Sequence, residues 1–157
     1  GDEIGMRYLE GLTSVEGGYD RTGSRSPMQW EKKEGFGFTS AKTSYIPFDK
    51  SEDAPSVEEQ SVNSDSLLAA VKELLALRAA HKALQSFGEF VPVFAQKERY
   101  PFAYERRAAG ENILVVLNPA DREECAAFDC SGKVLWSVGG VPQDGKIPAR
   151  SACVIAK

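Results

Sequence analysis

The sequence predicts an α+β chain in which a loop-rich segment and one long helix precede an antiparallel β domain. Three observations support this order. Residues 1–62 are rich in Gly, Ser, Pro and charge, with only short apolar pieces. Residues 63–84 then carry apolar side chains at helical spacing, and residues 85–157 hold short β-rich runs separated by turn residues. We therefore expect two domains, 1–84 and 85–157.

The loop-rich first third is too long to fold by itself. Segments beyond about 12–15 residues without regular structure are uncommon in compact folds. We therefore expect residues 1–62 to lie as loops over a scaffold that is not visible in this sequence.

The helix is predicted over residues 64–84. Its candidate N-caps are Asn63, Ser64 and Asp65. An apolar stripe follows at helical spacing, made of Leu67, Val71, Leu74 and Leu75. Arg78, His81 and Lys82 fall in the last turns, where positive charge complements the helix dipole. His81 is the only histidine, and we expect this helix-end role for it rather than a ligand role.

The β-rich runs are FGEFVPVFA, PFAYERR, NILVVLNP, ECAAFDC, KVLWSV and SACVIA. Residues 113–117 are apolar throughout, which predicts a central strand buried on both faces. Residues 108–111 read as a hairpin turn. We expect an antiparallel β-sandwich or sheet of about six strands. Its core is expected to hold the aromatic residues Phe90, Phe94, Tyr100, Phe102, Tyr104 and Trp136.

Composition excludes several classes of function. A net charge of −4 and a pI near 5.1 argue against a general nucleic-acid or anionic-membrane binder. No apolar run approaches the roughly 20 residues that cross a bilayer, and no signal peptide is visible. Because the chain starts without Met, we expect a fragment of a longer protein. A cytoplasmic location is favoured, with a periplasmic or secreted one left open.

The cysteines and acidic residues predict no metal or cofactor. Cys125, Cys130 and Cys153 are odd in number and form no CxxC pair, so we expect small buried residues on strands. The acidic segment 49–55 lacks the alternating oxygen ligands of an EF-hand loop and is interpreted as a solvated loop.

A set of motifs points to one family. GDEIGM, GSRSPMQW, GFTS, YIPF and SVEEQ precede the helix in that order. With the helix, this series resembles the C-terminal portion of an α-amylase-family α-glucosidase, of the oligo-1,6-glucosidase and trehalose-synthase branch. SRSPMQW, residues 24–30, corresponds to the family signature S/T-R-T/S-P-M-Q-W.

The resemblance implies a TIM (β/α)8 barrel followed by an all-β antiparallel sandwich domain. Residues 1–84 would then be the end of the barrel, comprising the long loop after strand 8 and the last helix at 64–84. Residues 85–157 would be the C-terminal sandwich. The scaffold that the loops require would be the missing upstream barrel.

The resemblance also implies a retaining glycoside hydrolase acting on short α-glucosides. The nucleophilic Asp, the acid/base Glu and a third Asp of this family come from earlier barrel strands, and none of their motifs occurs here. We therefore expect no catalytic residue in this chain and no activity of the chain alone. Arg25, the arginine of the signature, would bind hydroxyls of the terminal glucose with its fixed fork of donors. A loop-pairing role for Arg25 stays open.

Four further residues are expected to support the site or its structure. Asp2 and Glu3 are neighbours on a segment expected to be extended, so their side chains should point to opposite sides. We expect them to bond backbone groups near the barrel rim or to support the site. Gln29 is expected to satisfy buried backbone groups. Trp30 is expected to anchor the loop with Pro27 and Met28, or to stack on a sugar ring.

Other positions qualify the resemblance. Glu58 and Gln60 are expected to fix the loop ahead of the helix. Glu31 stands where the family commonly has Asp, which puts little in doubt. Tyr45 replaces the Trp of many oligo-1,6-glucosidases, which weakens any case for α-1,6 specificity.

Two alternatives remain open. One is a transglycosylase or isomerase of the trehalose-synthase or sucrose-isomerase kind, in which the intermediate passes to a sugar acceptor. The other is a non-catalytic carbohydrate-binding β module, or a homologue without the carboxylates. A barrel cut at this point would expose the apolar stripe of the helix, which predicts self-association of the chain.

Overall fold

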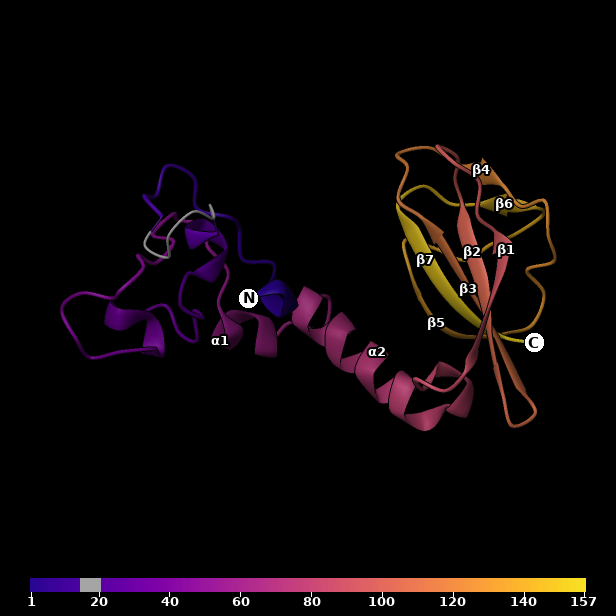
Figure 1. Cartoon of the computed structure of the whole chain (residues 1–157), viewed down its shortest axis with the longest axis horizontal. Coiled ribbons are helices and arrows are strands. Elements are labelled where there is room, and N and C mark those ends of the chain that lie inside the picture. Colours follow the sequence, from indigo (N-terminus) through magenta and orange to yellow (C-terminus); the bar gives the residue numbers. More distant parts are fainter. Residues whose placement is uncertain (15–20) are drawn as a thin grey trace. The chain divides into compact units, whose positions relative to one another are not determined.

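A computed structural model describes residues 1–14 and 21–157 of the chain. The chain forms two compact units, Gly1–Glu73 and Leu74–Lys157. Figure 1 gives the order of the elements along the chain. The domain boundary that the sequence predicts between residues 84 and 85 stays a prediction.

The first unit consists of short helical turns joined by irregular chain. Three of these turns are 3₁₀ helices: η1 (Asp2–Ile4), η2 (Thr22–Arg25) and η3 (Glu34–Gly37). A short α-helix, α1 (Val57–Ser61), follows them. Among the described residues of this unit, only a few apolar side chains are buried, namely Ile4, Ile46 and Ala54. Backbone hydrogen bonds between irregular segments therefore account for much of its organisation.

The long helix α2 covers Leu67–Ala80, so the predicted range 64–84 is wrong at both ends. Ser66 caps its start, because the Ser66 Oγ accepts a hydrogen bond from the backbone N–H of Ala69 at 3.1 Å. The predicted caps at residues 63–65 lie too early in the chain, because the residue directly before the helix is Ser66. His81 has an extended backbone, with φ −114° and ψ 121°, and this ends α2.

A separate 3₁₀ helix, η4 (Lys82–Leu84), follows, so His81 and Lys82 lie beyond the last turn of α2. In the second unit His81 Nδ1 lies 3.1 Å from Glu111 Oε1. Glu111 Oε2 accepts a further hydrogen bond from the backbone N–H of Ala83 at 2.9 Å. His81 therefore connects the turn after α2 with the β sheet. Contrary to the prediction from the sequence, it does not complement the helix dipole from the last turn of α2.

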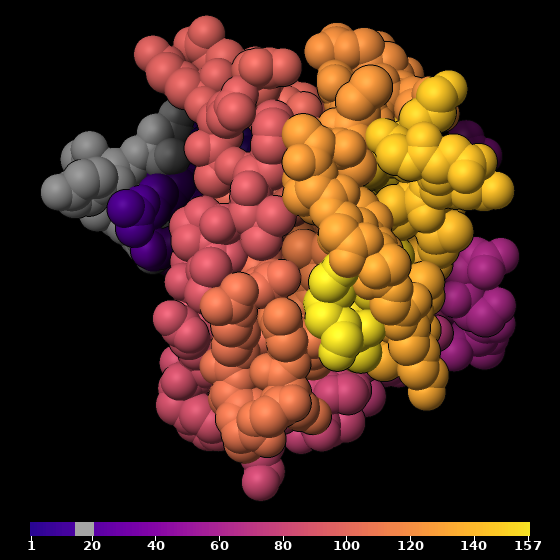
Figure 2. Space-filling view, turned by 90° about the vertical axis from the view of Figure 1, so that its right-hand side faces the viewer, coloured from indigo at the N-terminus to yellow at the C-terminus, as the bar shows by residue number. Residues whose placement is uncertain are grey.

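The second unit contains a five-stranded antiparallel sheet in the order β1-β2-β3-β7-β5 (Figure 1). Its strands are β1 (Glu89–Phe94), β2 (Phe102–Ala108), β3 (Glu111–Asn118), β5 (Lys133–Val138) and β7 (Ser151–Ala156). The short strands β4 (Glu124–Cys125) and β6 (Lys146–Ile147) pair as a second sheet. In the space-filling view the chain end after β7, in bright yellow, emerges between the segments carrying β2–β3 and β5 (Figure 2).

The central strand β3 is buried on both faces, as its apolar sequence predicts. Leu114 and Val116 belong to a core cluster that also contains Ile147 of β6. Ile113 and Val115 belong to a second cluster on the other face. The hairpin turn at residues 108–111 is also confirmed. Ala109 and Gly110 both have positive φ, 50° and 81°, as a two-residue type I′ turn requires.

Some predictions about the core are wrong. Phe90 and Tyr100 are exposed, at 49% and 46%, because they lie on the edge strand β1 and in the loop before β2. Phe94, Phe102, Tyr104 and Trp136 are half-buried. Among the cysteines only Cys153 is buried; Cys125 is exposed on the short strand β4, and Cys130 is half-buried in a loop.

Candidate functional site

The signature segment 24–30 is held by the start of α1. The first backbone N–H groups of a helix have no acceptor within the helix. Here the N–H of Val57 donates to the carbonyl of Gln29 at 3.0 Å, and the N–H of Glu58 donates to the carbonyl of Trp30 at 2.9 Å. The signature backbone therefore supplies the acceptors that the first turn of α1 requires.

The side chain of Ser56 caps the start of α1. Ser56 is fully buried, and its Oγ accepts a hydrogen bond from the N–H of Glu59 at 3.3 Å and lies 3.0 Å from Glu59 Oε2. Lys32 Nζ contacts Glu59 Oε1 at 2.8 Å, and the Lys32 and Ser56 bonds lower the pKa of the Glu59 carboxyl. Lys32, two residues after the signature, thus contacts the first turn of α1.

Arg25 is exposed at the end of η2. The position of this turn is set by Gly23, whose carbonyl accepts a hydrogen bond from the N–H of Leu9 at 3.1 Å. A Cβ at residue 23 would lie 2.1 Å from the carbonyl oxygen of Leu9, so only glycine permits this approach.

Gln29 and Trp30 differ in exposure although they are neighbours. Gln29 is 1% exposed, and its Nε2 donates to the backbone carbonyl of Pro55, a half-buried residue, at 3.1 Å. Trp30 is 47% exposed, so its side chain is available to a ligand or to another surface. Its backbone N–H donates to the carbonyl of Phe36 at 2.9 Å.

Asp2 and Glu3 lie in the 3₁₀ turn η1, so the expectation of an extended segment is wrong. Both side chains are exposed. Gln60 anchors this segment: its Nε2 donates to the carbonyl of Ile4 at 2.8 Å, and its Oε1 accepts from the N–H of Leu68 at 3.0 Å. Gln60 therefore connects η1 with the start of α2, as its place ahead of the helix suggests.

An ion-pair cluster in the first unit was missed by sequence reasoning. Arg7 contacts Asp49 Oδ2 through Nε and Asp53 Oδ2 through Nη2, each at 2.9 Å. Asp49 is only 7% exposed, so the interpretation of segment 49–55 as wholly solvated is wrong. Hydrogen bonds from Ser51 and the charge of Arg7 lower the pKa of Asp49. The one local signal was the Asp-x-Ser turn, in which Asp49 Oδ1 accepts from the N–H of Ser51 at 3.0 Å.

A cavity of about 410 Å³ lies within the loop after the signature. Phe36 and Phe48 line it, and their rings stack with centroids 4.7 Å apart. Lys42, Ser44 and Lys50 also contribute to its walls. Among residues 1–14 and 21–157 no group of three or more His, Cys, Asp or Glu side chains is placed to hold a metal. In the same residues no helix is long and apolar enough to cross a membrane.

Comparison with known proteins identifies the family. Residues 1–86, more than half of the chain, match the family described as alpha amylase, catalytic domain. The chain belongs to the alpha-amylase family. The predicted resemblance and fold class are thereby confirmed: the last loop and helix of a TIM (β/α)8 barrel precede an antiparallel β domain.

Relatives within the alpha-amylase family differ in their named activities. The chain is 30% identical over 112 residues to glucan 1,6-alpha-glucosidase from Streptococcus dysgalactiae subsp. equisimilis, covering 71% of this chain and 20% of that protein. It is 34% identical over 124 residues to trehalose synthase from Thermus thermophilus, covering 75% and 12%. It is 33% identical over 122 residues to the amino acid transporter heavy chain SLC3A1 from Mus musculus, covering 75% and 17%.

The solved structures include isomaltulose synthase from Klebsiella sp. LX3, with a TM-score of 0.74 and 22% identity. The match covers 87% of this chain and 25% of that one, and at this identity it shows a shared fold alone. The chain spans about a fifth or less of the length of these curated relatives.

Proposed function

We propose that this chain is part of a retaining glycoside hydrolase of the α-glucosidase type that acts on short α-glucosides. The observation that carries the proposal is the SRSPMQW segment, which is held through the carbonyls of Gln29 and Trp30 and in which Arg25 is exposed. The relative named glucan 1,6-alpha-glucosidase supports an activity of the α-glucosidase type.

In this proposal Arg25 binds glucose hydroxyls, and Trp30 and Gln29 support it. The guanidinium offers several donors in one plane and stays charged at all working pH values. Asp2 and Glu3 have a supporting role in the same region. The catalytic carboxylates belong to barrel strands outside these 157 residues, so the chain alone is expected to be inactive.

The test is hydrolysis of p-nitrophenyl α-glucoside by the longer protein that contains this chain. Arg25→Ala should lower kcat/KM by about 10- to 100-fold, because a hydrogen bond to a charged group contributes about 1.5–3 kcal/mol. Arg21→Ala is the matched control, because Arg21 is also an exposed arginine and lies at the other end of η2, and this variant should retain activity. Equal activity of the two variants would overturn the role of Arg25, and hydrolysis by the 157-residue chain alone would overturn its expected inactivity.

A second candidate is a transglycosylase or isomerase, which the relative named trehalose synthase favours. Both reactions use the same covalent intermediate and differ in whether water or a sugar accepts it. Product analysis on maltose and sucrose distinguishes them: free glucose alone indicates hydrolysis, whereas a rearranged disaccharide indicates the second candidate.

A non-catalytic homologue is the remaining alternative. The relative named as an amino acid transporter heavy chain shows that the family includes proteins that are not named as glycosidases. The sequence upstream of Gly1 decides this point, because an active enzyme needs the three barrel carboxylates there.

A further inference from the structure

The cavity inside the loop of residues 34–50 combines the two kinds of surface that a sugar requires. A pyranose ring has apolar C–H faces and an edge of hydroxyl groups. The rings of Phe36 and Phe48 give the cavity an apolar wall, and Phe38 packs edge-on against Phe48 with centroids 6.1 Å apart. Its volume of about 410 Å³ falls within the range of small-molecule sites.

The polar part of the wall offers both donors and acceptors. The lining residues include Lys42 and Lys50, which carry ammonium groups, Glu34, which carries a carboxylate, and Ser44, which carries a hydroxyl. Ser44 Oγ donates its proton to the carbonyl of Ile46 at 2.6 Å, which leaves its lone pairs as acceptors. Because charges of both signs line the cavity, a neutral polyhydroxylated ligand fits this wall better than an anion.

The backbone at Phe36, which lines the cavity, has a strained conformation that its packing contacts maintain. Phe36 has φ 52°, in the left-handed region that disfavours a bulky side chain, and it lies between Gly35 at 69° and Gly37 at 67°. Its carbonyl accepts hydrogen bonds from the N–H groups of Trp30 at 2.9 Å and Glu31 at 3.2 Å. Such strain is concentrated at functional sites.

The same bonds connect the cavity to the signature. A Cβ at Gly37 would lie 3.1 Å from the Cβ of Trp30, so the turn packs directly on the signature tryptophan. The turn that carries Phe36 therefore packs on the backbone that follows Arg25, so this side of the cavity is not independent of the signature.

We propose that this cavity binds a hexose unit of the substrate remote from the glucose held by Arg25. The inference rests on the proposed function, because it assigns a longer α-glucoside to the same site. The sugar face packs on Phe36 and Phe48, and its hydroxyls bond to Lys42, Lys50 and Glu34.

The test compares substrates of different length in the longer protein that contains this chain. The double variant Lys42→Met/Lys50→Met removes two ammonium groups but keeps their aliphatic stems. It should lower kcat/KM for maltotriose and isomaltotriose by about 10-fold and leave that for p-nitrophenyl α-glucoside unchanged. The control Lys72→Met/Lys133→Met removes the same charge from exposed positions on α2 and β5 and should affect neither substrate.

Equal losses on long and short substrates, or no loss on either, would overturn the cavity as a sugar site while leaving the glycosidase proposal intact. If the wild type hydrolyses none of these substrates, the proposed function fails, and the cavity is then tested by calorimetric titration with the same trisaccharides. Saturable binding that the Lys42→Met/Lys50→Met variant loses supports the cavity, and no binding overturns it. A crystal structure of the longer protein with upstream residues filling the cavity would also overturn it.

Discussion

Gly23 and Leu9 approach each other so closely that a Cβ on residue 23 would lie 2.1 Å from the Leu9 carbonyl oxygen. The N–H of Leu9 also donates to the carbonyl of Gly23 at 3.1 Å. This contact fixes η2 and, with it, the exposed position of Arg25.

Gly23→Ala should therefore destabilise the first unit by about 3 kcal/mol, because a backbone carbonyl cannot yield as a flexible side chain does. Gly11→Ala is the matched control: residue 11 has φ 74° but nothing within 4 Å of a new Cβ, so only backbone strain of about 1 kcal/mol is expected. Urea unfolding followed by circular dichroism measures both. Equal losses would show that the contact with Leu9 is unimportant.

Arg106 should contribute more to stability than its neighbour Arg107. Arg106 donates to three backbone carbonyls around η4: Ala83 through Nε at 3.3 Å, and Gln85 and Gly88 through Nη2 at 2.7 and 2.8 Å. Arg106→Met leaves these acceptors without their donor and should cost about 2 kcal/mol in the free energy of unfolding.

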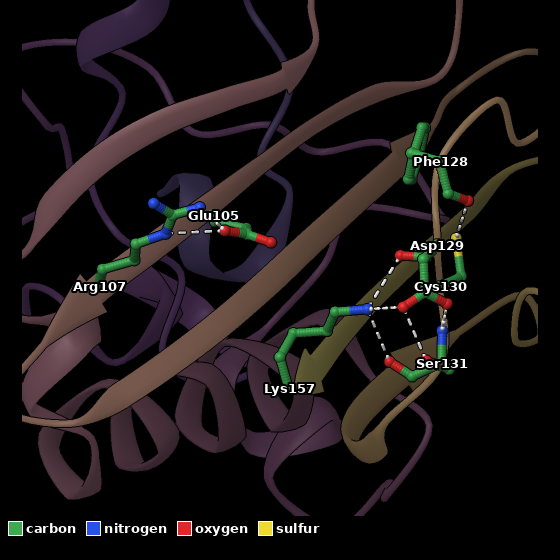
Figure 3. Close-up of polar contacts among 7 residues, drawn as sticks. All are labelled: Glu105, Arg107, Phe128, Asp129, Cys130, Ser131 and Lys157. Atoms are coloured by element: carbon green, nitrogen blue, oxygen red, sulfur yellow. Dashed lines mark hydrogen bonds and ion pairs between the residues drawn. The ribbon is translucent and has the colours of Figure 1, made fainter.

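Arg107→Met is the matched control. Arg107 is half-exposed and pairs with Glu105 two residues earlier on β2, as Figure 3 shows. An exposed pair of this kind contributes under about 1 kcal/mol. Thermal or urea unfolding of both variants gives the comparison, and a larger loss for Arg107→Met would contradict it.

The ion pair between Lys157, directly after β7, and Asp129 should make the stability of the fold depend on pH in the acid range. Lys157 Nζ donates to Asp129 Oδ2 at 2.6 Å and to the carbonyls of Asp129 and Ser131 at 3.1 Å each (Figure 3). The Lys157 bond and those from Ser131 hold the pKa of Asp129 well below its ordinary value near 3.8. A carboxyl group whose pKa is lower in the folded state than in the unfolded state stabilises the fold at pH values above its unfolded-state pKa. This stabilisation is lost as the pH falls toward the folded-state pKa.

Asp129→Asn should accordingly lower the melting temperature most at neutral pH, and the difference from wild type should shrink below about pH 4. The same substitution in a Lys157→Met background should have much less effect, because the partner is already removed. Melting curves between pH 7 and pH 2.5 test both points. A difference that grows on acidification would show that the sign is wrong.

The helix α2 should drive self-association of the 157-residue chain. Leu67, Leu74 and Leu75 are 47%, 37% and 58% exposed, so the apolar stripe that the sequence predicts is open to solvent. Leu75→Glu should reduce association, whereas Ala76→Glu, at the adjacent exposed position, should not. Light scattering after size exclusion measures this. A wild-type monomer at high concentration would contradict the prediction.

Local signals in the sequence predicted the β domain better than the first unit. The apolar run at 113–117 and the turn at Ala109–Gly110 determine strand burial and hairpin geometry within a few residues. The start of α2 was not predictable in this way. Four consecutive cap-type residues, 63–66, compete, and Ser66 is distinguished from the others by a hydrogen bond from its Oγ to the carbonyl of Gln60 in the preceding helix α1 at 2.8 Å.

Contacts between distant segments explain most of the errors in the first unit. Asp49 is buried because Arg7 pairs with it, and the sequence near residue 49 does not indicate that Arg7 is its partner. The strained turn at Phe36 likewise depends on hydrogen bonds that its carbonyl accepts from the signature segment, and these bonds are seen only in the structure. The motif order identified the family, but the sequence did not indicate the cavity beside the signature.

The two backbone bonds from α1 to Gln29 and Trp30 also bring together the two ends of the segment between residues 31 and 56. The segment is therefore a closed loop whose two ends are joined by backbone hydrogen bonds. Under the proposed function, exchange of this loop would alter how far along a sugar chain the protein makes contact and would leave Arg25 in place. Selectivity for substrate length would then change separately from the proposed recognition of the first glucose.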